Sequence, residues 1–261
     1  MDREPSPFRL LYTGLHDGFY NMGLDEAILE GVSRGESPPT LRLYGWSPPA
    51  VSVGYFQGLE EEVDLPACEA RGIDVVRRIS GGGAVFHQAE LTYSVIMADT
   101  HPLAGKSLRE SYENLCVGIV EGLALLGVPS RFVPINDIVT GDRKISGNAQ
   151  TRRMGCILQH GTVILDLDVD LMFELLRVPR EKMRGRIIRD VKDRVTSLRA
   201  LRPAVSLPEA AAALAEGFRR ALSLDYGPSG DFRAEPGSAE AERARALGAG
   251  KFASREWLYK R

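Results

Sequence analysis

The chain has 261 residues, of which 44% are hydrophobic and 26% are charged, and its formal net charge is −2. This length allows one large domain, or one domain with an appendage, and the small net charge gives no case for a nucleic-acid partner. No apolar run approaches the length of a membrane span, and the N-terminal residues lack the apolar core of a signal peptide.

Helix and strand signals alternate along the first half of the chain. We expect Asn21 to cap a helix that runs to about Ser33, with acidic residues in its early turns. A short helix is expected at residues 64–71. Runs rich in β-branched and aromatic residues predict strands at residues 40–44, 51–56, 73–78, 84–86 and 91–97.

In the second half, apolar residues recur at helical spacing over residues 108–126, and Gly127 ends this helix. A hairpin is expected to join residues 138–140 to 144–146, and a strand follows at 156–165. Further helices are expected at about 170–176, 180–194, 206–223 (opened by a capping box at Ser206 and Glu209) and 239–247. Because strands dominate the first two thirds and helices dominate the end, the sequence predicts an α+β, or mixed α/β, domain.

The three cysteines, Cys68, Cys116 and Cys156, are few, odd in number and without the spacing of a metal site. We therefore expect a reduced, cytoplasmic protein. Cys116 falls on the apolar face of the helix at 108–126 and Cys156 begins a strand. Since cysteine is among the most buried residue types, both are expected in the core and not as nucleophiles.

A glycine-rich turn follows two arginines at residues 77–87, which read RRISGGGAVFH. Glycines let successive backbone N–H groups face outward in a concavity that favours anions, and nearby arginines add charge and forked donors. The spacing matches neither a P-loop nor GxGxxG. The sequence predicts a strand, an anion-binding turn and a second strand. From these residues alone, the alternative is a tight β-turn with two solvated arginines.

Lys144 lies in a second dense stretch, residues 136–147. A lysine on a strand beside glycines can reach a phosphate or carbonyl oxygen as a point charge. The alternative is a solvated hairpin lysine. Asn136 and Asp137 either assist a divalent cation or cap the turn. His87 and His160 lack the further ligands at recognisable spacing that a metal site needs, so we expect structural histidines satisfied by backbone partners.

Taken together and in order, these stretches resemble the lipoate–protein ligase A family, which shares its superfamily with biotin–protein ligases and with lipoyl and octanoyl transferases. The resemblance runs from about Asn21 to about Asp168, and rests on residues 77–87, 136–138, 143–147 and 160–162. The chain departs from the family pattern beside the histidine. Gln88 stands where an acidic residue usually follows His87, and residues 89–91 stand where Gly-Asn is common.

The resemblance implies a central mixed β-sheet flanked by helices, with a catalytic domain over residues 1–200 and a helical extension over 201–261 packed on it. It also implies an enzyme that uses ATP and Mg²⁺ to convert lipoate to lipoyl-AMP, and then forms an amide with a lysine of an acceptor domain. Cations and backbone N–H groups are needed there because the carboxylate and ATP repel each other.

Lys144 is the implied catalytic residue, in contact with the carbonyl and α-phosphate oxygens, and Asp137 is the implied Mg²⁺ ligand. An apolar channel that includes Val53 would take the acyl chain. The implied substrate- and cofactor-binding residues are Arg77, Gly81, Gly82, Gly83, Ala84, Val85, Phe86, His87, Asn136, Asp137, Ser146, Gly147, His160, Gly161 and Thr162.

Two other activities stay open. Residues 43–48 and 147–152 also resemble octanoyl transferases of the cysteine–lysine type, which move an acyl group between carrier proteins. Those enzymes carry their cysteine just before the lysine motif, where this chain has residues 133–137 and no cysteine. That difference favours the ATP-dependent ligase. The second alternative is a non-catalytic protein that binds lipoyl domains.

The implied partners are lipoyl-acceptor proteins, namely the glycine cleavage H protein or the lipoyl domains of 2-oxoacid dehydrogenase E2 subunits. No full accessory domain is evident after the helical tail, so we expect a small separate accessory subunit to assist lipoate activation. Neither a nucleic acid nor a membrane is expected as a partner.

Overall fold

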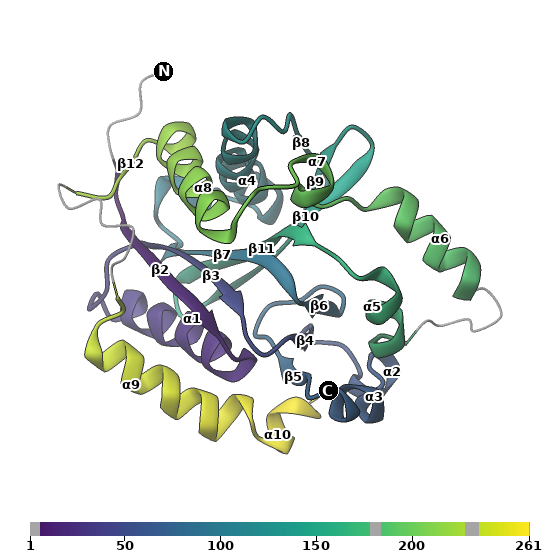
Figure 1. The fold of residues 1–261 in the computed structure, drawn as a ribbon. Coiled ribbons are helices and arrows are strands. Elements are labelled where there is room, and N and C mark those ends of the chain that lie inside the picture. The colour runs from purple at the N-terminus through teal and green to yellow at the C-terminus, as the bar shows by residue number, and fades with distance from the viewer. Residues whose placement is uncertain (1–5, 178–183, 228–234, 261) are drawn as a thin grey trace.

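The computed structural model describes residues 6–177, 184–227 and 235–260. Its largest element is a seven-stranded sheet at the centre of the molecule (Figure 1). The strand order is β2 (Arg9–His16), β3 (Thr40–Trp46), β7 (Ala89–Ala98), β11 (Cys156–Asp166), β10 (Arg143–Arg153), β9 (Asp137–Thr140) and β8 (Arg131–Val133). The pair β2–β3 is parallel and the other neighbours are antiparallel. The expected mixed α/β fold with a central mixed sheet is therefore confirmed.

Helices cover both faces of this sheet (Figure 1). One face carries α4 (Leu108–Leu125) and α8 (Leu207–Leu222), whose apolar residues share a large core cluster with the strands. The other face carries α1 (Gly18–Ser33) and α9 (Ser238–Leu247), which share a second cluster with strand residues. Two helical layers explain why strand β3 is buried along its whole length.

A second, three-stranded sheet carries the glycine-rich turn. Its central strand β4 (Ala50–Val53) runs parallel to β5 (Asp74–Arg77) and antiparallel to β6 (Val85–His87). Three short helices complete its core: α2 (Leu59–Glu62), α3 (Leu65–Ala70) and α5 (Val169–Leu175). The glycine-rich turn thus connects the two outer strands across β4.

The remaining described elements are short or peripheral. They are the paired strands β1 (Ser6–Pro7) and β12 (Leu224–Asp225), the 3₁₀ helix η1 (Pro102–Ala104), α6 (Arg184–Arg194), α7 (Leu198–Leu201), the π-helical turn η3 (Gly248–Phe252) and α10 (Arg255–Leu258). Among the helices of the described segments, none combines the length and the apolar character that a bilayer crossing requires.

Several predicted element ends are confirmed by their capping contacts. The α4 helix begins at Leu108 because the Ser107 side chain accepts a hydrogen bond from the Glu110 backbone N–H. The expected capping box of Ser206 and Glu209 opens α8, with both reciprocal hydrogen bonds present.

Other predicted ends are wrong. The first helix is capped by Asp17, whose carboxylate accepts from the Tyr20 N–H, and Asn21 lies inside the helix with its side chain buried. The strand expected at 51–56 ends at Val53, because the chain turns there to approach the glycine-rich turn. Of the helix expected at 180–194, residues 184–194 form α6, and residues 180–183 lie outside the described residues.

Residues on both sides of position 200 contribute to one core. Phe218 of α8 packs against Tyr93 of β7, with ring centroids 5.4 Å apart, and both belong to the largest apolar cluster. The division into a catalytic domain and a C-terminal extension at residue 200 stays a prediction.

Candidate active site

A cavity of about 320 Å³ is lined by residues of both sheets and of α5 and α6. This volume lies at the lower end of the range for ligand pockets. Its walls are largely apolar, with Trp46, Phe86, Ile164 and Met172 among them. The cations Arg78 and Lys144 also line it, so the cavity combines space for an apolar chain with positive charge.

The glycine-rich turn forms one wall of the cavity. Gly82 has a φ of +97°, and the backbone of Gly54 approaches it so closely that a Cβ on Gly54 would lie 2.0 Å from the Gly82 carbonyl oxygen. Arg78 stabilises the conformation of the turn, because its guanidinium donates hydrogen bonds to the carbonyl oxygens of Gly81 and Gly83. Only glycine tolerates this combination of backbone angle and contact.

The side chains of the two arginines before the turn contact different parts of the molecule. Arg77 is fully buried, and its guanidinium donates to the backbone carbonyl oxygens of Gly54, Gln57 and Leu258. It does not line the cavity, whereas Arg78 does. Burial lowers the pKa of Arg78 to about 10, which still leaves it charged at neutral pH. The cation that faces the cavity is therefore Arg78 and not the expected Arg77.

Lys144 reaches the cavity from β10. Its Nζ lies 2.7 Å from Oδ1 of Asp137 on β9, and a Cβ on Gly147 would lie 2.9 Å from that Nζ. Glycine at 147 thus leaves room for the lysine to lie over its own strand. The residues that the structure describes include no group of three or more His, Cys, Asp or Glu side chains suited to a metal ion. The carboxylate of Asp137 is paired with Lys144 at 2.7 Å, and its role as a Mg²⁺ ligand stays a prediction.

Asn136 and Gly161 support the strand that carries Lys144. The Asn136 and Asn148 side chains each donate to the other residue's carbonyl oxygen, at 2.5 and 2.8 Å. A Cβ on Gly161 would lie 2.1 Å from Oδ1 of Asn148, which makes glycine necessary there as well.

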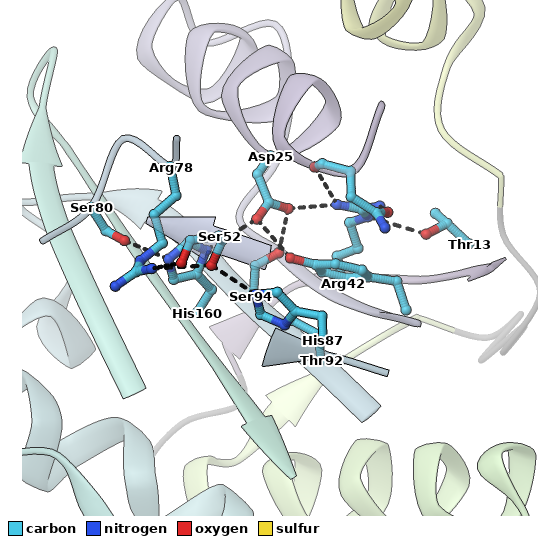
Figure 2. Close-up of polar contacts among 12 residues, drawn as sticks. Thr13, Asp25, Arg42, Ser52, Arg78, Ser80, His87, Thr92, Ser94 and His160 are labelled. Atoms are coloured by element: carbon cyan, nitrogen blue, oxygen red, sulfur yellow. Dashed lines mark hydrogen bonds and ion pairs between the residues drawn. The ribbon is translucent and has the colours of Figure 1, made fainter. Parts of the chain in front are cut away.

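The two histidines each lie in a chain of serine, histidine and acid (Figure 2 labels both serines, both histidines and Asp25). His87 lies between Ser52 and Glu90, at 2.7 and 2.6 Å. His160 lies between Ser80, at 2.6 Å, and Asp25, at 3.4 Å. Both are buried, as expected for structural histidines, but their partners are side chains and not the expected backbone groups.

Asp25 and His160 belong to a buried charged network with Arg42 (Figure 2). Burial alone would raise the pKa of Asp25, but Arg42 and His160 outweigh it and lower that pKa. Burial lowers the pKa of His160, and Asp25 opposes this shift only in part. The fold therefore favours a charged Asp25 and a neutral His160.

The three cysteines, all within the described residues, are buried, and none lines the cavity. Burial raises the pKa of Cys68 to about 11 and of Cys116 to about 12, and raises that of Cys156 as well. Cys116 and Cys156 lie in apolar core clusters, so their expected core positions are confirmed.

The structure brings most of the sequence-predicted site residues to this cavity. The predicted residues that line it are Gly82, Gly83, Ala84, Val85, Phe86, His87, Asn136, Lys144, Gly147, His160, Gly161 and Thr162. Arg77, Gly81, Asp137 and Ser146 are not among the lining residues, nor is Val53, which packs in the core of the small sheet. The Ser146 hydroxyl is buried and has no hydrogen-bond partner among the described residues.

Sequence reasoning missed several residues that line the cavity, among them Ser52, Arg78, Glu90 and Trp46. Arg78 and Glu90 stand within or just after the glycine-rich motif, so their proximity was readable from the sequence. The place of Ser52 depends on the pairing of β4 with β6, and the sequence carries no separate signal for it.

The sequence model of the lipoyl protein ligase A/B catalytic domain matches residues 17–219, a span that includes every cavity-lining residue. The chain belongs to this family. The predicted family resemblance is therefore confirmed, and the lipoyl protein ligase A/B fold agrees with the mixed sheet described above.

Solved structures of the lipoyl protein ligase A/B type share the fold over nearly the whole chain. One is a bipartite lipoate–protein ligase from Thermoplasma acidophilum, studied with its E2 lipoyl domain. It is 30% identical, with a TM-score of 0.85 and coverage of 99% of this chain and 97% of that one. Another is lipoate–protein ligase A bound with ATP, at 28% identity and a TM-score of 0.82, covering 98% of this chain and 99% of that one.

Curated relatives overturn the predicted ATP-dependent ligase. Octanoyltransferase LipM of Kyrpidia tusciae is 41% identical over 97% of this chain and 99% of its own length. Other relatives that match most of the chain at 35–43% identity carry the same name. The expectation that the missing cysteine indicates a ligase is thus wrong. The solved structures and the relatives agree that this chain is an enzyme of the lipoate/octanoate ligase–transferase family.

Proposed function

We propose that this protein is an acyltransferase, which moves an octanoyl group from a carrier protein to a lysine of a lipoyl-acceptor domain. The observation that carries this proposal is the near full-length similarity to octanoyltransferases at 41% identity. The ATP and Mg²⁺ of the predicted ligase reaction have no part in it.

The cavity has the chemistry that such a transfer needs. Its apolar walls suit a saturated chain, for which burial is worth about 0.8 kcal/mol per CH₂. When an amine or another nucleophile attacks an acyl carbonyl, negative charge develops on the oxygen, and fixed donors and cations stabilise it. Lys144, held by Asp137 at 2.7 Å, supplies such a cation at the cavity. We assign to Lys144 the polarisation of the acyl carbonyl.

The acceptor that we propose is a lipoyl domain, of a 2-oxoacid dehydrogenase E2 subunit or of the glycine cleavage H protein. The E2 class is supported by the Thermoplasma acidophilum relative, which was studied with its E2 lipoyl domain. The expected accessory subunit was tied to ATP-dependent activation, and the proposed transfer does not require it. We place the reaction in the cytoplasm, where these acceptors and acyl carriers meet.

The proposal is tested by mixing the protein with octanoyl-loaded acyl carrier protein and an unmodified lipoyl domain, without ATP. Intact-mass spectrometry of the lipoyl domain should show one added octanoyl group, and a lipoyl domain whose acceptor lysine is replaced by arginine should show none. Modification that requires free octanoate or lipoate together with ATP would contradict the proposal. Binding of the lipoyl domain without any transfer would contradict it too.

Lys144→Ala should lower the rate of this transfer by about 100-fold or more, the usual effect of removing one group that stabilises a developing oxyanion. Its matched control is Lys192→Ala. Lys192 also pairs with an aspartate at 2.7 Å and is similarly exposed, but it does not line the cavity. Near-normal transfer by a folded Lys144→Ala protein would remove the proposed role.

A further inference from the structure

Ser52, His87 and Glu90 form a hydrogen-bonded chain in the cavity wall (Figure 2 shows Ser52 and His87). The Ser52 Oγ lies 2.7 Å from Nε2 of His87, and Nδ1 of the same ring lies 2.6 Å from Oε1 of Glu90. All three residues line the cavity. A hydroxyl, an imidazole and a carboxylate in this order are the parts of an activated serine nucleophile.

We propose that Ser52 is the acyl-carrying nucleophile of this enzyme, with His87 as its general base and Glu90 as the group that orients His87. The inference rests on the acyltransferase function proposed above and specifies its chemistry. It adds a covalent ester intermediate, which neither the predicted site residues nor the family resemblance contains.

The hydrogen bonds fix the tautomer that this role requires. The Glu90 carboxylate accepts, so Nδ1 of His87 carries the proton and Nε2 offers its lone pair. The Ser52 hydroxyl then has to donate to Nε2. Its oxygen accepts from Nη1 of Arg78 at 3.0 Å, so a fixed cation already lies beside the oxygen that would attack. This arrangement stabilises negative charge on that oxygen.

Neighbouring side chains hold the imidazole in place. The ring of Trp46 stacks on that of His87, with centroids 4.0 Å apart and planes inclined by 14°. The Trp46 Nε1–H donates to Thr92 Oγ1, and the Thr92 hydroxyl donates to Oε1 of Glu90. Both ends of the histidine are therefore positioned by packing and hydrogen bonds before any substrate binds, as efficient catalysis requires.

The other serine–histidine–acid chain is not equivalent. Ser80 and Asp25 do not line the cavity, and the Asp25–His160 distance of 3.4 Å is longer than the Glu90–His87 distance of 2.6 Å. Asp25 is also engaged by Arg42 at 2.7 Å. None of the three cysteines of the described chain lines the cavity either. Ser52 is thus the cavity-lining hydroxyl that has both a base and an orienting acid.

The reaction balances in two steps. In the first, Ser52 Oγ attacks the carbonyl carbon of the octanoyl thioester and its proton passes to Nε2 of His87. The C–S bond breaks, and the carrier leaves as a thiol with that proton. In the second, the neutral amine of the acceptor lysine attacks the Ser52 ester and gives a proton to His87. The C–O bond breaks, Ser52 regains a proton, and the amide is released.

The decisive experiment loads the full-length protein with octanoyl-acyl carrier protein in a single turnover, before any lipoyl domain is added. We expect release of carrier thiol and a mass gain of one octanoyl group, which peptide mapping places on Ser52. Alkaline hydroxylamine should remove an ester at Ser52, whereas an amide on a lysine would resist it. If no carrier thiol is released until the lipoyl domain is present, the covalent step is absent and the inference is wrong.

Variants separate a chemical role of Ser52 from a structural one. Ser52→Ala should form no adduct and should lower transfer by about 100-fold or more. Ser52→Cys should still form an adduct, now a thioester that neutral hydroxylamine cleaves. The control is Ser111→Ala, which removes another buried serine that does not line the cavity, and should leave loading unchanged. Thermal unfolding checks that each variant is folded.

Two failures are distinguishable. If Ser52→Ala transfers octanoate as fast as wild type, the role of Ser52 is wrong but the acyltransferase function stands. The same holds if the adduct maps to a lysine or a cysteine. Absence of transfer by wild type overturns the acyltransferase function, and the inference with it.

Discussion

Arg42 is a charged side chain with no exposed surface, and its hydrogen-bond partners come from β2 and α1. Its guanidinium donates to Thr13, to Asn21 and to the Asp25 carboxylate, the last at 2.7 Å (Figure 2). Two charges removed from water are tolerated only as a complete, hydrogen-bonded pair. The network therefore joins β2, α1 and β3 through one residue.

Arg42→Ala should lower the free energy of unfolding by about 3–5 kcal/mol, because it leaves the Asp25 charge buried without its partner. Urea denaturation at neutral pH measures this loss. The control is Arg34→Ala, which breaks an exposed ion pair with Glu36 and should cost about 1 kcal/mol or less. Equal losses for the two variants would show that the buried network is not held by charge.

His160 should make stability depend on pH in a defined window. Burial lowers its pKa in the folded state, with Asp25 opposing and Arg78 and His87 adding to the shift. The unfolded chain therefore binds a proton first as pH falls below about 6.5. Stability should be complete above that value and fall toward pH 5.

The measurement for His160 is the difference in unfolding free energy between pH 7 and pH 5. His16 and His101, whose pKa values burial also lowers, contribute in the same direction. The informative comparison is thus the slope of wild type against that of His160→Gln, which should be shallower. An identical slope would mean that the pKa of His160 is the same in the folded and the unfolded protein.

The sequence predicted some residues of the cavity, but not those whose place depends on contacts between segments far apart in the chain. The sequence placed the glycine-rich turn and Lys144 correctly at one cavity. The prediction placed Arg77 at the cavity, whereas Arg78 lines it. Successive side chains of a strand point to opposite faces, so an error of one residue is enough to select the wrong arginine. Ser52 could not be found, since its role depends on His87 and Glu90 approaching from strands that follow much later in the chain.

At the scale of elements, the contact of α4 with α8 depends on glycine. A Cβ on Gly217 would lie 2.3 Å from the backbone nitrogen of Gly122. A Cβ on Gly118 would lie 2.5 Å from the ring of Phe218. Small residues at these positions let the two backbones approach, and rigid backbone atoms cannot move aside for a methyl group.

Gly217→Ala should therefore lower the free energy of unfolding by about 1–3 kcal/mol or more, the cost of overpacking a core. Gly250→Ala is the matched control, because nothing lies within 4 Å of the Cβ it would add and its φ is not positive. That variant should be neutral or slightly stabilising, as Gly-to-Ala changes at unstrained sites are. Thermal and urea unfolding measure the free energy of unfolding of both variants. Similar free energies for the two would contradict the close-contact explanation.

Long, periodic elements were predictable, and short edge elements were not. The α4 helix was predicted almost to the residue, because eighteen residues repeat the apolar spacing. The edge strands β2 and β8 were missed, since they carry only part of the alternating pattern. Asn21 and Asp17 are both good caps, but the Asn21 side-chain oxygen accepts a hydrogen bond from Arg42 of β3, and Asp17 caps the helix.

On the scale of the whole molecule, the C-terminal segment supports the start of the glycine-rich motif. The Leu258 carbonyl oxygen accepts two hydrogen bonds from the Arg77 guanidinium, and Nε1 of Trp257 donates to the Arg77 carbonyl oxygen. Some 180 residues separate these partners. The glycine-rich motif is therefore contacted by a C-terminal segment that lies outside the span of the sequence resemblance.

Trp257→Ala should destabilise the protein by about 3–5 kcal/mol, as truncation of a buried tryptophan does. It should also speed hydrogen–deuterium exchange at β5 and the glycine-rich turn, because Arg77 loses the hydrogen bond that Trp257 donates. Tyr259→Ala, two residues further on, is the control, since Tyr259 is 38% exposed. Faster exchange confined to α10 in Trp257→Ala, with an unchanged turn, would show that the C-terminal segment does not support the site.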